Sequence, residues 1–381
     1  MEKQRIIIGG DIVPTESNVK MFCQGDIKQV VGEKLFEYLK SDTFLICNLE
    51  TPLSNTSSPI LKCGPTFITP EEAVTGLKKM GINLVSLANN HIKDQGSRGI
   101  LSTCHALSSA NIDYVGVGKN ANEASVPYIF IFNGKRIGVY SCSEHEFSSA
   151  SENSFGANTF DALVSLDHIS AMKNSCDYII TLYHGGKEYY RFPSPDLQKI
   201  CRRIVDKGAD LVICQHSHCI GAEEKYKNST IIYGQGNFIF NKKNNEYWNS
   251  SLLVCLDNFF EISYLPIVRT YLGTRMADEN ESRNILFEFK NRSDLIQSSD
   301  FIKEEYKKFS RSIIDSYIAA FSGKKCRLWF LLNKLSKGKM IKWMYKFRYP
   351  KSQLTMLKNY IECEAHRELI IEAFDDAIMK E

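Results

Sequence analysis

The chain has 381 residues, of which 43% are hydrophobic and 24% charged, and its formal net charge is +3. This composition excludes a disordered chain, and the small net charge gives no indication of a nucleic-acid partner. The 12 cysteines are spread singly without a Cys-x-x-Cys pair, so we expect reduced, mostly buried thiols. No apolar run is long enough for a membrane span or a signal-peptide core, and we therefore expect a cytoplasmic protein.

Strand and helix patterns alternate through the first 215 residues, which predicts an α/β sheet covered by helices. Short apolar runs predict strands, and Asn133-Gly134 predicts a hairpin turn between two of them. In chain order the predicted strands are 5–9, 44–47, 82–87, 114–117, 126–132, 136–140, 178–183, 211–214, 231–233, 251–256 and 262–268. Helices are predicted at 30–40, 70–80, 99–110, 160–173 and 194–207.

Polar residues with metal-binding side chains follow five of the predicted strands. In open α/β sheets, sites form beyond the carboxyl ends of the strands. His216-Ser217-His218 is the most informative of these groups, because two imidazoles at one strand end point into one site. We therefore predict a single metal site assembled from distant segments, with the ligands Asp11, Glu50, Asn90, His184, His216 and His218.

The predicted ligand set is mixed in nitrogen and oxygen, which suits Mn²⁺, Fe or Zn²⁺ better than Ca²⁺. Six ligands are too many for one four-coordinate catalytic zinc with an open position. They suffice for two ions that share a carboxylate and clamp a phosphoryl group or similar oxyanion. We expect two divalent ions, or one. His91 is then the candidate general acid, and Asp94 the residue that orients its imidazole.

Other interpretations of these residues stay open at this point. Asp11 could cap a turn, Glu50 could be an exposed loop acid, and Asn90 could be a left-handed turn residue. Three more polar residues are candidates to contact substrate or to hydrogen-bond a ligand, namely Glu188, Asn237 and Asn48. For Glu188 a solvated loop is an equal alternative.

Seven motifs in order resemble the CapA-like poly-γ-glutamate capsule synthesis family, within the calcineurin-like metallophosphatase superfamily. The motifs extend over about residues 5–240. They are Gly10-Asp11, Asn48-Leu49-Glu50-Thr51-Pro52-Leu53, Ala88-Asn89-Asn90-His91-Ile92-Lys93-Asp94-Gln95-Gly96, His184-Gly185-Gly186-Lys187-Glu188-Tyr189, Gly208-Ala209-Asp210-Leu211-Val212, His216-Ser217-His218 and Tyr233-Gly234-Gln235-Gly236-Asn237-Phe238.

The resemblance implies a four-layer α/β/β/α metallophosphatase-like sandwich with a helical C-terminal extension. It also implies a division of the ligands between two ions. Asp11 and His218 would bind one ion, while Asn90, His184 and His216 would bind the other. Glu50 would take the bridging place that an Asp usually holds.

Two residues depart from the pattern of the superfamily. Its first motif is usually Asp-x-His, whereas this chain has Asp11-Ile12-Val13. Asn89 stands where the wider superfamily usually has a glycine. One ion site therefore lacks an imidazole, which bears on the number of ions and on the strength of any phosphatase activity. The CapA branch also commonly has a membrane anchor, and this chain shows no anchor pattern.

The alternation of strand and helix patterns ends after about residue 272, and helical spacing follows. We therefore predict a CapA-like metallophosphatase domain over 1–272 and a helical, partly basic C-terminal extension over 273–381. A helix is predicted at 300–320, and one or two more are predicted at 351–380. Residues 324–351 contain ten Lys or Arg and no Asp or Glu, interleaved with aromatic residues. Such a segment can dock on an anionic membrane surface, at its inner face here, or on a synthase partner, or it can simply be a solvated helix face.

Three functions are compatible with these patterns. The first is a metal-dependent hydrolase of capsule or poly-γ-glutamate biosynthesis that acts on a phosphoester or on a bond of an anionic surface polymer. The alternative is a non-hydrolytic polymer-binding or assembly factor of a capsule synthesis or export complex. A nucleotide or nucleic-acid phosphodiesterase ranks last, because residues 1–270 show no base-stacking platform, and we expect no specific nucleic-acid partner.

Overall fold

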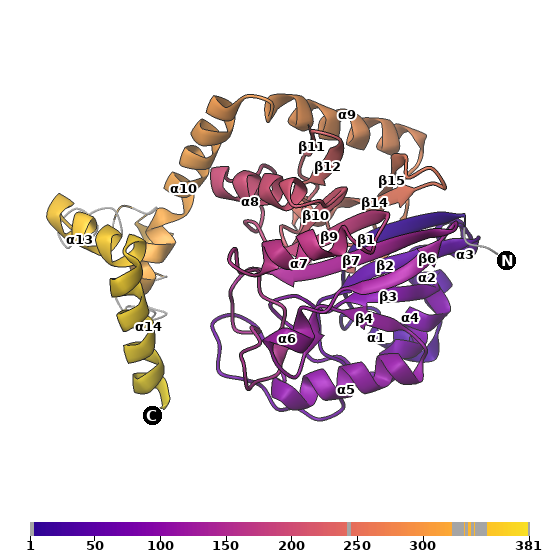
Figure 1. Cartoon of the computed structure of the whole chain (residues 1–381), viewed down its shortest axis with the longest axis horizontal. Coiled ribbons are helices and arrows are strands. Elements are labelled where there is room, and N and C mark those ends of the chain that lie inside the picture. Colours follow the sequence, from indigo (N-terminus) through magenta and orange to yellow (C-terminus); the bar gives the residue numbers. More distant parts are fainter. Residues whose placement is uncertain are drawn as a thin grey trace. The chain divides into compact units, whose positions relative to one another are not determined.

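The computed structural model in Figure 1 describes residues 4–241, 245–321 and 349–379, together with 331, 334–336 and 339. The chain forms two compact units, one ending at Glu304 and one beginning at Glu305. The first unit contains every predicted metal ligand, and its two main sheets account for their placement.

The first sheet has a parallel centre with an antiparallel flank. Strands β1 to β4 run parallel, and β14, β15 and β16 extend the sheet beside β1 in antiparallel order. A short strand, β13, pairs in parallel with the end of β1. Their bounds are Arg5–Val13 (β1), Thr43–Leu49 (β2), Ile82–Ser86 (β3), Asp113–Val115 (β4), Ile239–Phe240 (β13), Ser250–Leu256 (β14), Ile262–Arg269 (β15) and Thr274–Met276 (β16).

The second sheet has the strand order β11-β12-β10-β9-β7-β6. Its four central strands are parallel, and the edge strands β6 and β11 are antiparallel to their neighbours. Asn133 and Gly134 turn the chain between β6 and β7, as predicted. The bounds are Tyr128–Phe132 (β6), Lys135–Ser143 (β7), Tyr178–His184 (β9), Leu211–Gln215 (β10), Glu223–Tyr226 (β11) and Ser229–Ile232 (β12), and a separate pair joins Val117–Gly118 (β5) to Gly156–Ala157 (β8).

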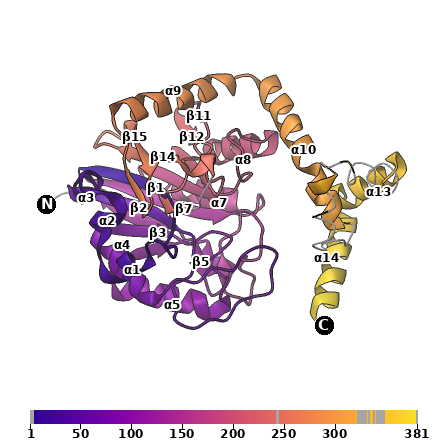
Figure 2. The same cartoon turned by 180° about the vertical axis from the view of Figure 1, so that it is seen from behind.

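The two sheets pack face to face between two layers of helices, so the predicted four-layer α/β/β/α fold is confirmed (Figures 1 and 2). Alternate residues of β1 divide between the layers. Ile6 and Ile8 face the core between the sheets, and Ile7 and Ile12 face the helices on the outer side. Those helices are Val19–Gln24 (α1), Ile27–Val31 (α2), Glu33–Lys40 (α3), Val74–Met80 (α4) and Gly96–Ser109 (α5), while Ser165–Met172 (α7) and Pro195–Asp206 (α8) cover the second sheet.

The helices predicted over 30–40 and 160–173 differ in extent from the observed ones. The helix predicted over 30–40 is divided into α2 and α3 at Gly32, whose φ of 72° is a left-handed conformation that glycine adopts without steric cost. The helix predicted from residue 160 begins only at Ser165. Residues 156–160 instead form strand β8 and hydrogen bonds to the end of β7, such as the bond from Phe160 N to Ser143 O.

Helix α9 (Glu279–Leu295) was not predicted, although Asp278 and Glu281 form a capping box at its start. Its buried Phe289 packs on Tyr264 of β15, with ring centres 4.9 Å apart. Because α9 packs on the sheets, the first unit extends to Glu304, whereas the predicted domain boundary lies between residues 272 and 273.

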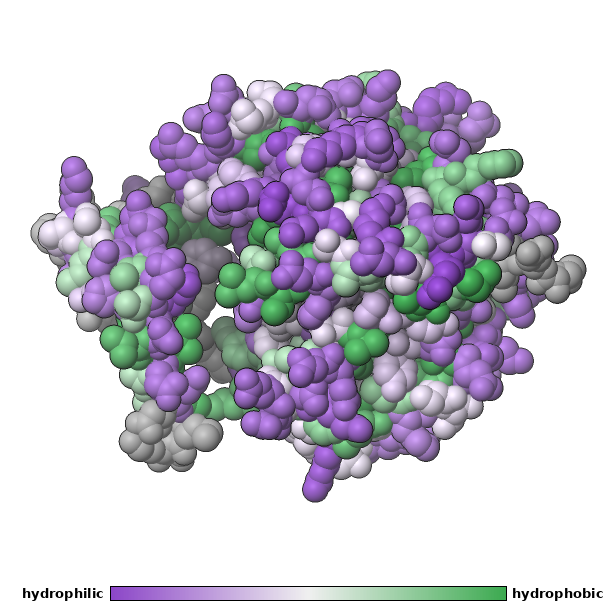
Figure 3. Space-filling model, in the orientation of Figure 1, coloured by the Kyte–Doolittle hydropathy of each residue, from purple (hydrophilic) through white to green (hydrophobic). Residues whose placement is uncertain are grey.

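The second unit is helical over its described residues. Helix α10 (Ser299–Phe321) leads into it, and Lys351–Glu362 (α13) and Glu364–Met379 (α14) follow. The predicted basic segment, 324–351, lies mostly outside the described residues. Within the described part of the chain, none of the helices has both the length and the apolar character that a membrane crossing requires. The face of the first unit drawn in Figure 3 is largely hydrophilic, with apolar residues in scattered small groups.

Candidate metal centre

The carboxyl ends of parallel strands in both sheets meet at one place and bring the predicted ligands together. Asp11 pairs in register with Asn48 at the ends of β1 and β2, and Glu50 follows β2. His184 is the last residue of β9, and it pairs with Gln215, the last residue of β10. His216 and His218 follow directly. These positions are the ones expected for a site beyond the strand ends.

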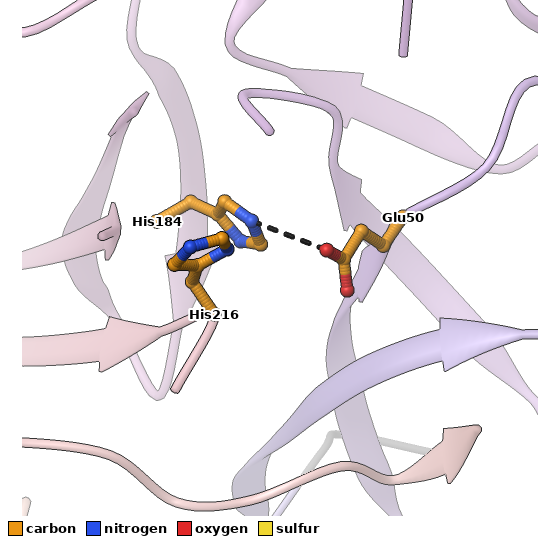
Figure 4. A group of neighbouring side chains, drawn as sticks. All are labelled: Glu50, His184 and His216. Atoms are coloured by element: carbon orange, nitrogen blue, oxygen red, sulfur yellow. Dashed lines mark ion pairs between the residues drawn. The ribbon is translucent and has the colours of Figure 1, made fainter. Parts of the chain in front are cut away.

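Two groups of three side chains are close enough to hold an ion each. One is Glu50, His184 and His216, drawn in Figure 4, and the other is Asp11, Glu50 and His218. Within each group the potential ligand atoms lie within 4.8 Å of one another. Glu50 belongs to both groups. The two groups therefore share one carboxylate.

The buried ligand atoms without hydrogen bonds fit a metal ion. Both carboxylate oxygens of Glu50 and Nδ1 of His216 are buried, and they have no hydrogen-bond partner among the described residues. Nε2 of His184 lies 3.4 Å from Glu50 Oε1, an ion-pair distance that does not meet hydrogen-bond geometry. Buried carboxylates without partners are costly in a folded protein. A cation between Glu50 and His216 would remove this cost.

Hydrogen bonds from asparagine side chains orient the predicted ligands. Asn48 donates from Nδ2 to Asp11 Oδ1 at 2.8 Å, and Asn89 donates from Nδ2 to Asn48 Oδ1 at 3.0 Å. Asn237 Oδ1 lies 2.9 Å from His218 Nδ1 and accepts its proton, which leaves Nε2 of His218 available to an ion. Asn89, the departure from the usual glycine, thus orients Asn48.

The predicted ligand Asn90 lies beside the Glu50–His184–His216 group. Its Oδ1 is 3.0 Å from His184 Nε2. His184 Nε2 is thereby close both to Asn90 Oδ1 and to Glu50 Oε1, which lies 3.4 Å away. The role of Asn90 as a ligand stays a prediction.

For Asp11 and His218, the neighbouring polar and charged groups outweigh the effect of burial on the pKa. Burial by itself raises the pKa of Asp11, but the close approach of His218, whose Nδ1 lies 3.6 Å from Asp11 Oδ2, and the charge of His184 outweigh it and lower this pKa to about 2. Burial lowers the pKa of His218, yet the pairing with Asp11 and the charge of Glu50 raise it to about 9. Burial and the two neighbouring imidazoles hold the pKa of His216 well below its usual value. Neutral His216 is thus ready to act as a ligand.

The backbone around the centre is close-packed and partly strained. His216 and His218 have φ values of 90° and 58°, in the left-handed region that side chains with a Cβ rarely adopt. A Cβ on Gly10 would lie 2.0 Å from the carbonyl oxygen of Gly236. Only glycine at position 10 permits this approach, which also lets Phe238 N donate to Asp11 O at 3.0 Å.

His91 and Asp94 form a tight pair beside the predicted ligands. His91 donates from Nδ1 to Asp94 Oδ2 at 2.6 Å, and the ring of Phe67 stacks on the imidazole with centres 4.1 Å apart. Lys62, whose side chain is 3% exposed, approaches Asp94 Oδ1 at 2.6 Å and donates to the carbonyl oxygen of Asn90 at 3.1 Å. Lys62 and Phe67 were not predicted, because both lie in the loop between β2 and α4, which has no periodic pattern.

The role of Glu188 as a contact for substrate stays a prediction. Glu188 is exposed, and among the described residues no hydrogen bond or ion pair links it to the centre. Its neighbour Tyr189 does approach, with its ring centre 6.1 Å from that of His218. The turn after Gly186, which has a φ of 113°, places the tyrosine rather than the glutamate beside the centre.

Comparison with known proteins places this chain among capsule proteins. It is 29% identical over 250 residues to the capsule biosynthesis protein CapA of Bacillus anthracis, covering 63% of this chain and 61% of the relative. It is 31% identical over 225 residues to the PGA biosynthesis protein CapA of Bacillus subtilis, covering 56% of this chain and 59% of the relative. The chain thus spans about three-fifths of the length of these curated relatives, at 61% and 59%.

A solved structure described as a novel phosphatase from Mycoplasma pneumoniae is 13% identical and covers 76% of this chain and 99% of that chain, with a TM-score of 0.43. A likeness this loose does not bear on function. The family comparison is decisive, because the model of the family described as bacterial capsule synthesis protein PGA_cap matches residues 5–242, more than half of the chain. The protein belongs to the PGA_cap family of bacterial capsule synthesis proteins.

Proposed function

We propose that this protein is a metal-dependent hydrolase of capsule or poly-γ-glutamate biosynthesis, acting at a dinuclear centre on a phosphoester or on a bond of an anionic surface polymer. The observation that carries the proposal is the pair of ligand groups that share Glu50, both of whose oxygens lack hydrogen bonds within the described residues. Membership in the capsule synthesis family supports the polymer as the biological context.

Two ions of Mn²⁺, Fe or Zn²⁺, held by Asp11, Glu50, Asn90, His184, His216 and His218, would supply Lewis-acid polarisation of an oxyanion and a water of lowered pKa. The protein's own groups contribute the proton and its position. Asp94 accepts the Nδ1 proton of His91, so Nε2 is the atom that gives a proton to the leaving oxygen. Phe67 covers one face of this imidazole and limits the access of water to it.

The metal content of the purified protein, measured with turnover of an aryl phosphodiester with and without Mn²⁺, tests the proposal. We expect close to two ions per chain and turnover that disappears in His218→Ala. His105→Ala is the matched control, because His105 is exposed on α5, away from the strand ends. If His218→Ala keeps its metal and its turnover, the assignment of the centre is wrong.

The alternative function is a non-hydrolytic factor that binds polymer or assembles a capsule synthesis complex. Val13 favours it, since this buried residue of β1 stands where the superfamily usually has a ligating histidine. Asp11 and Val13 are two residues apart on one strand and therefore face the same side. A centre with one weak ion site would hold a polymer without hydrolysing it.

Replacing Val13 by His is expected to raise the metal content of the protein toward two ions per chain, if the wild type holds fewer. The added imidazole would complete the group of Asp11, Glu50 and His218 with a fourth ligand, the number that Zn²⁺ favours. Elemental analysis of wild type and variant measures this change. Val13→Leu, which adds volume without a ligand atom, is the control. An unchanged metal content would show that position 13 does not set the number of ions.

The remaining parts of the proposal concern partners. We propose that residues 324–351, with ten basic and no acidic residues, dock on an anionic membrane surface or a synthase. This segment lies mostly outside the described residues, and its charge alone supports the idea. A phosphoester or anionic polymer is the proposed substrate, and no specific nucleic acid is expected.

A further inference from the structure

Two arginines from distant parts of the chain hydrogen-bond to the backbone of residues 220–221, just after His218. Arg191 lies in the loop before α8 and donates from Nη1 to the carbonyl oxygen of Ile220 at 3.2 Å. Arg292 lies on α9 and donates from Nε to the carbonyl oxygen of Gly221 at 2.8 Å. Hydrogen bonds to two successive carbonyls place the two guanidinium groups beside each other.

The positive charge of this pair is poorly neutralised by the described residues. Arg292 Nη1 lies 3.8 Å from Glu288 Oε2, and the Glu288 side chain is 62% exposed, so the pairing is weak. No described ion pair involves Arg191, whose guanidinium lies over the ring of Tyr247 at 4.9 Å. Burial and the neighbouring charge of Arg191 lower the pKa of Arg292 to about 10, so the Arg292 guanidinium is still charged at neutral pH.

A cavity of about 310 Å³ is lined by both arginines. Ser250 and Asn284 add a hydroxyl and an amide to its lining. Each guanidinium has five N–H donors. In the described part of the chain, each uses one of them on a carbonyl oxygen. The remaining donors and the two charges match the planar, bidentate recognition of a carboxylate or phosphate.

The cavity is close to the metal centre. Ile220 follows His218 by two residues, a span of at most about 7 Å. Ring contacts also connect the metal centre to the arginines. The ring centre of Tyr189 lies 6.1 Å from that of His218 and 5.8 Å from that of Tyr247. Arg191 lies over that last ring. A substrate with its reacting bond at the metal centre could therefore place a neighbouring group at the arginines.

We propose that Arg191 and Arg292 form an anion subsite that holds a carboxylate or phosphate group of the substrate next to the metal centre. The link to turnover rests on the proposed function, whereas anion binding by the arginines does not. A substrate with several anionic groups along its length gains from both sites at once. The subsite thus selects a polyanionic chain over a small, singly charged ester.

Calorimetric titration of the full-length, metal-stripped protein in a chelator-free, low-salt buffer tests the subsite. The probes are tripolyphosphate and an oligomer of glutamate, and the stronger of the two identifies the anion as phosphate or carboxylate. Arg191→Gln is expected to weaken binding by about tenfold or more, because a charge-assisted hydrogen-bond pair is lost. Glu288→Gln is expected to strengthen binding a few-fold, since it removes the nearby negative charge.

Arg283→Gln is the matched control, because Arg283 lies on the same helix, is 70% exposed and pairs with Glu279. The proposal is overturned if neither probe binds the wild type, or if Arg191→Gln and Glu288→Gln both leave its affinity unchanged. His216→Ala separates this outcome from the proposed function. His216→Ala should lose metal and keep anion binding, whereas Arg191→Gln should lose anion binding and keep its metal content.

Discussion

Replacing Glu50 by Gln is expected to remove most of the metal-dependent stabilisation of this protein. Glu50 is common to both ligand groups, so one substitution weakens both ion sites. An ion at about 100 times its Kd stabilises a fold by about 2.7 kcal/mol. For a chain of this size that corresponds to a rise in Tm of roughly 5 °C on adding Mn²⁺. We expect this rise in the wild type and little of it in Glu50→Gln.

Thermal unfolding with and without Mn²⁺ measures the effect without reference to any substrate. Glu188→Gln provides the control, since it is the same substitution at an exposed residue. The Gln side chain has nearly the same shape as Glu, so packing around residue 50 is preserved and the lost charge is the main change. An equal Mn²⁺-dependent rise in Tm for Glu50→Gln and wild type would exclude Glu50 as the bridging ligand.

Replacing His91 by Ala is expected to lower kcat by about 10²- to 10⁴-fold, the usual contribution of a general acid. The metal content should not change, because His91 belongs to neither ligand group. Its side chain is 10% exposed and fixed by Asp94 and Phe67. Measured kcat, KM and metal content of the same preparation separate a lost proton donor from a lost ion. His105→Ala should behave as the wild type does.

Asp94 variants are less informative than His91→Ala for a physical reason. The buried ammonium of Lys62 pairs with Asp94, so removing the carboxylate leaves Lys62 uncompensated. Breaking a buried pair in this way costs about 3–5 kcal/mol and would lower kcat through unfolding. A kcat in His91→Ala equal to that of the wild type would remove His91 from the mechanism.

The pattern of residues along the chain was sufficient to predict the secondary structure that builds the centre. The predicted strands at 5–9, 44–47, 178–183 and 211–214 correspond to β1, β2, β9 and β10. Their apolar runs are local properties of the sequence, and polar residues that interrupt such runs mark the strand ends. The helices were predicted less well, because Gly32 divides one of them and α9 has few apolar residues facing the sheets.

The residue pattern predicted that Asp11, His184, His216 and His218 stand near strand ends, as the structure confirms, and these residue types predict a metal site. Only the family resemblance predicted Glu50 as the shared residue, and no pattern in the sequence indicated that Lys62 is buried against Asp94 or that Arg191 meets Arg292. These facts depend on contacts between segments far apart in the chain. Only the packing of the two sheets and of α9 fixes such distances, because long-range contacts leave no periodic pattern in the residues that make them.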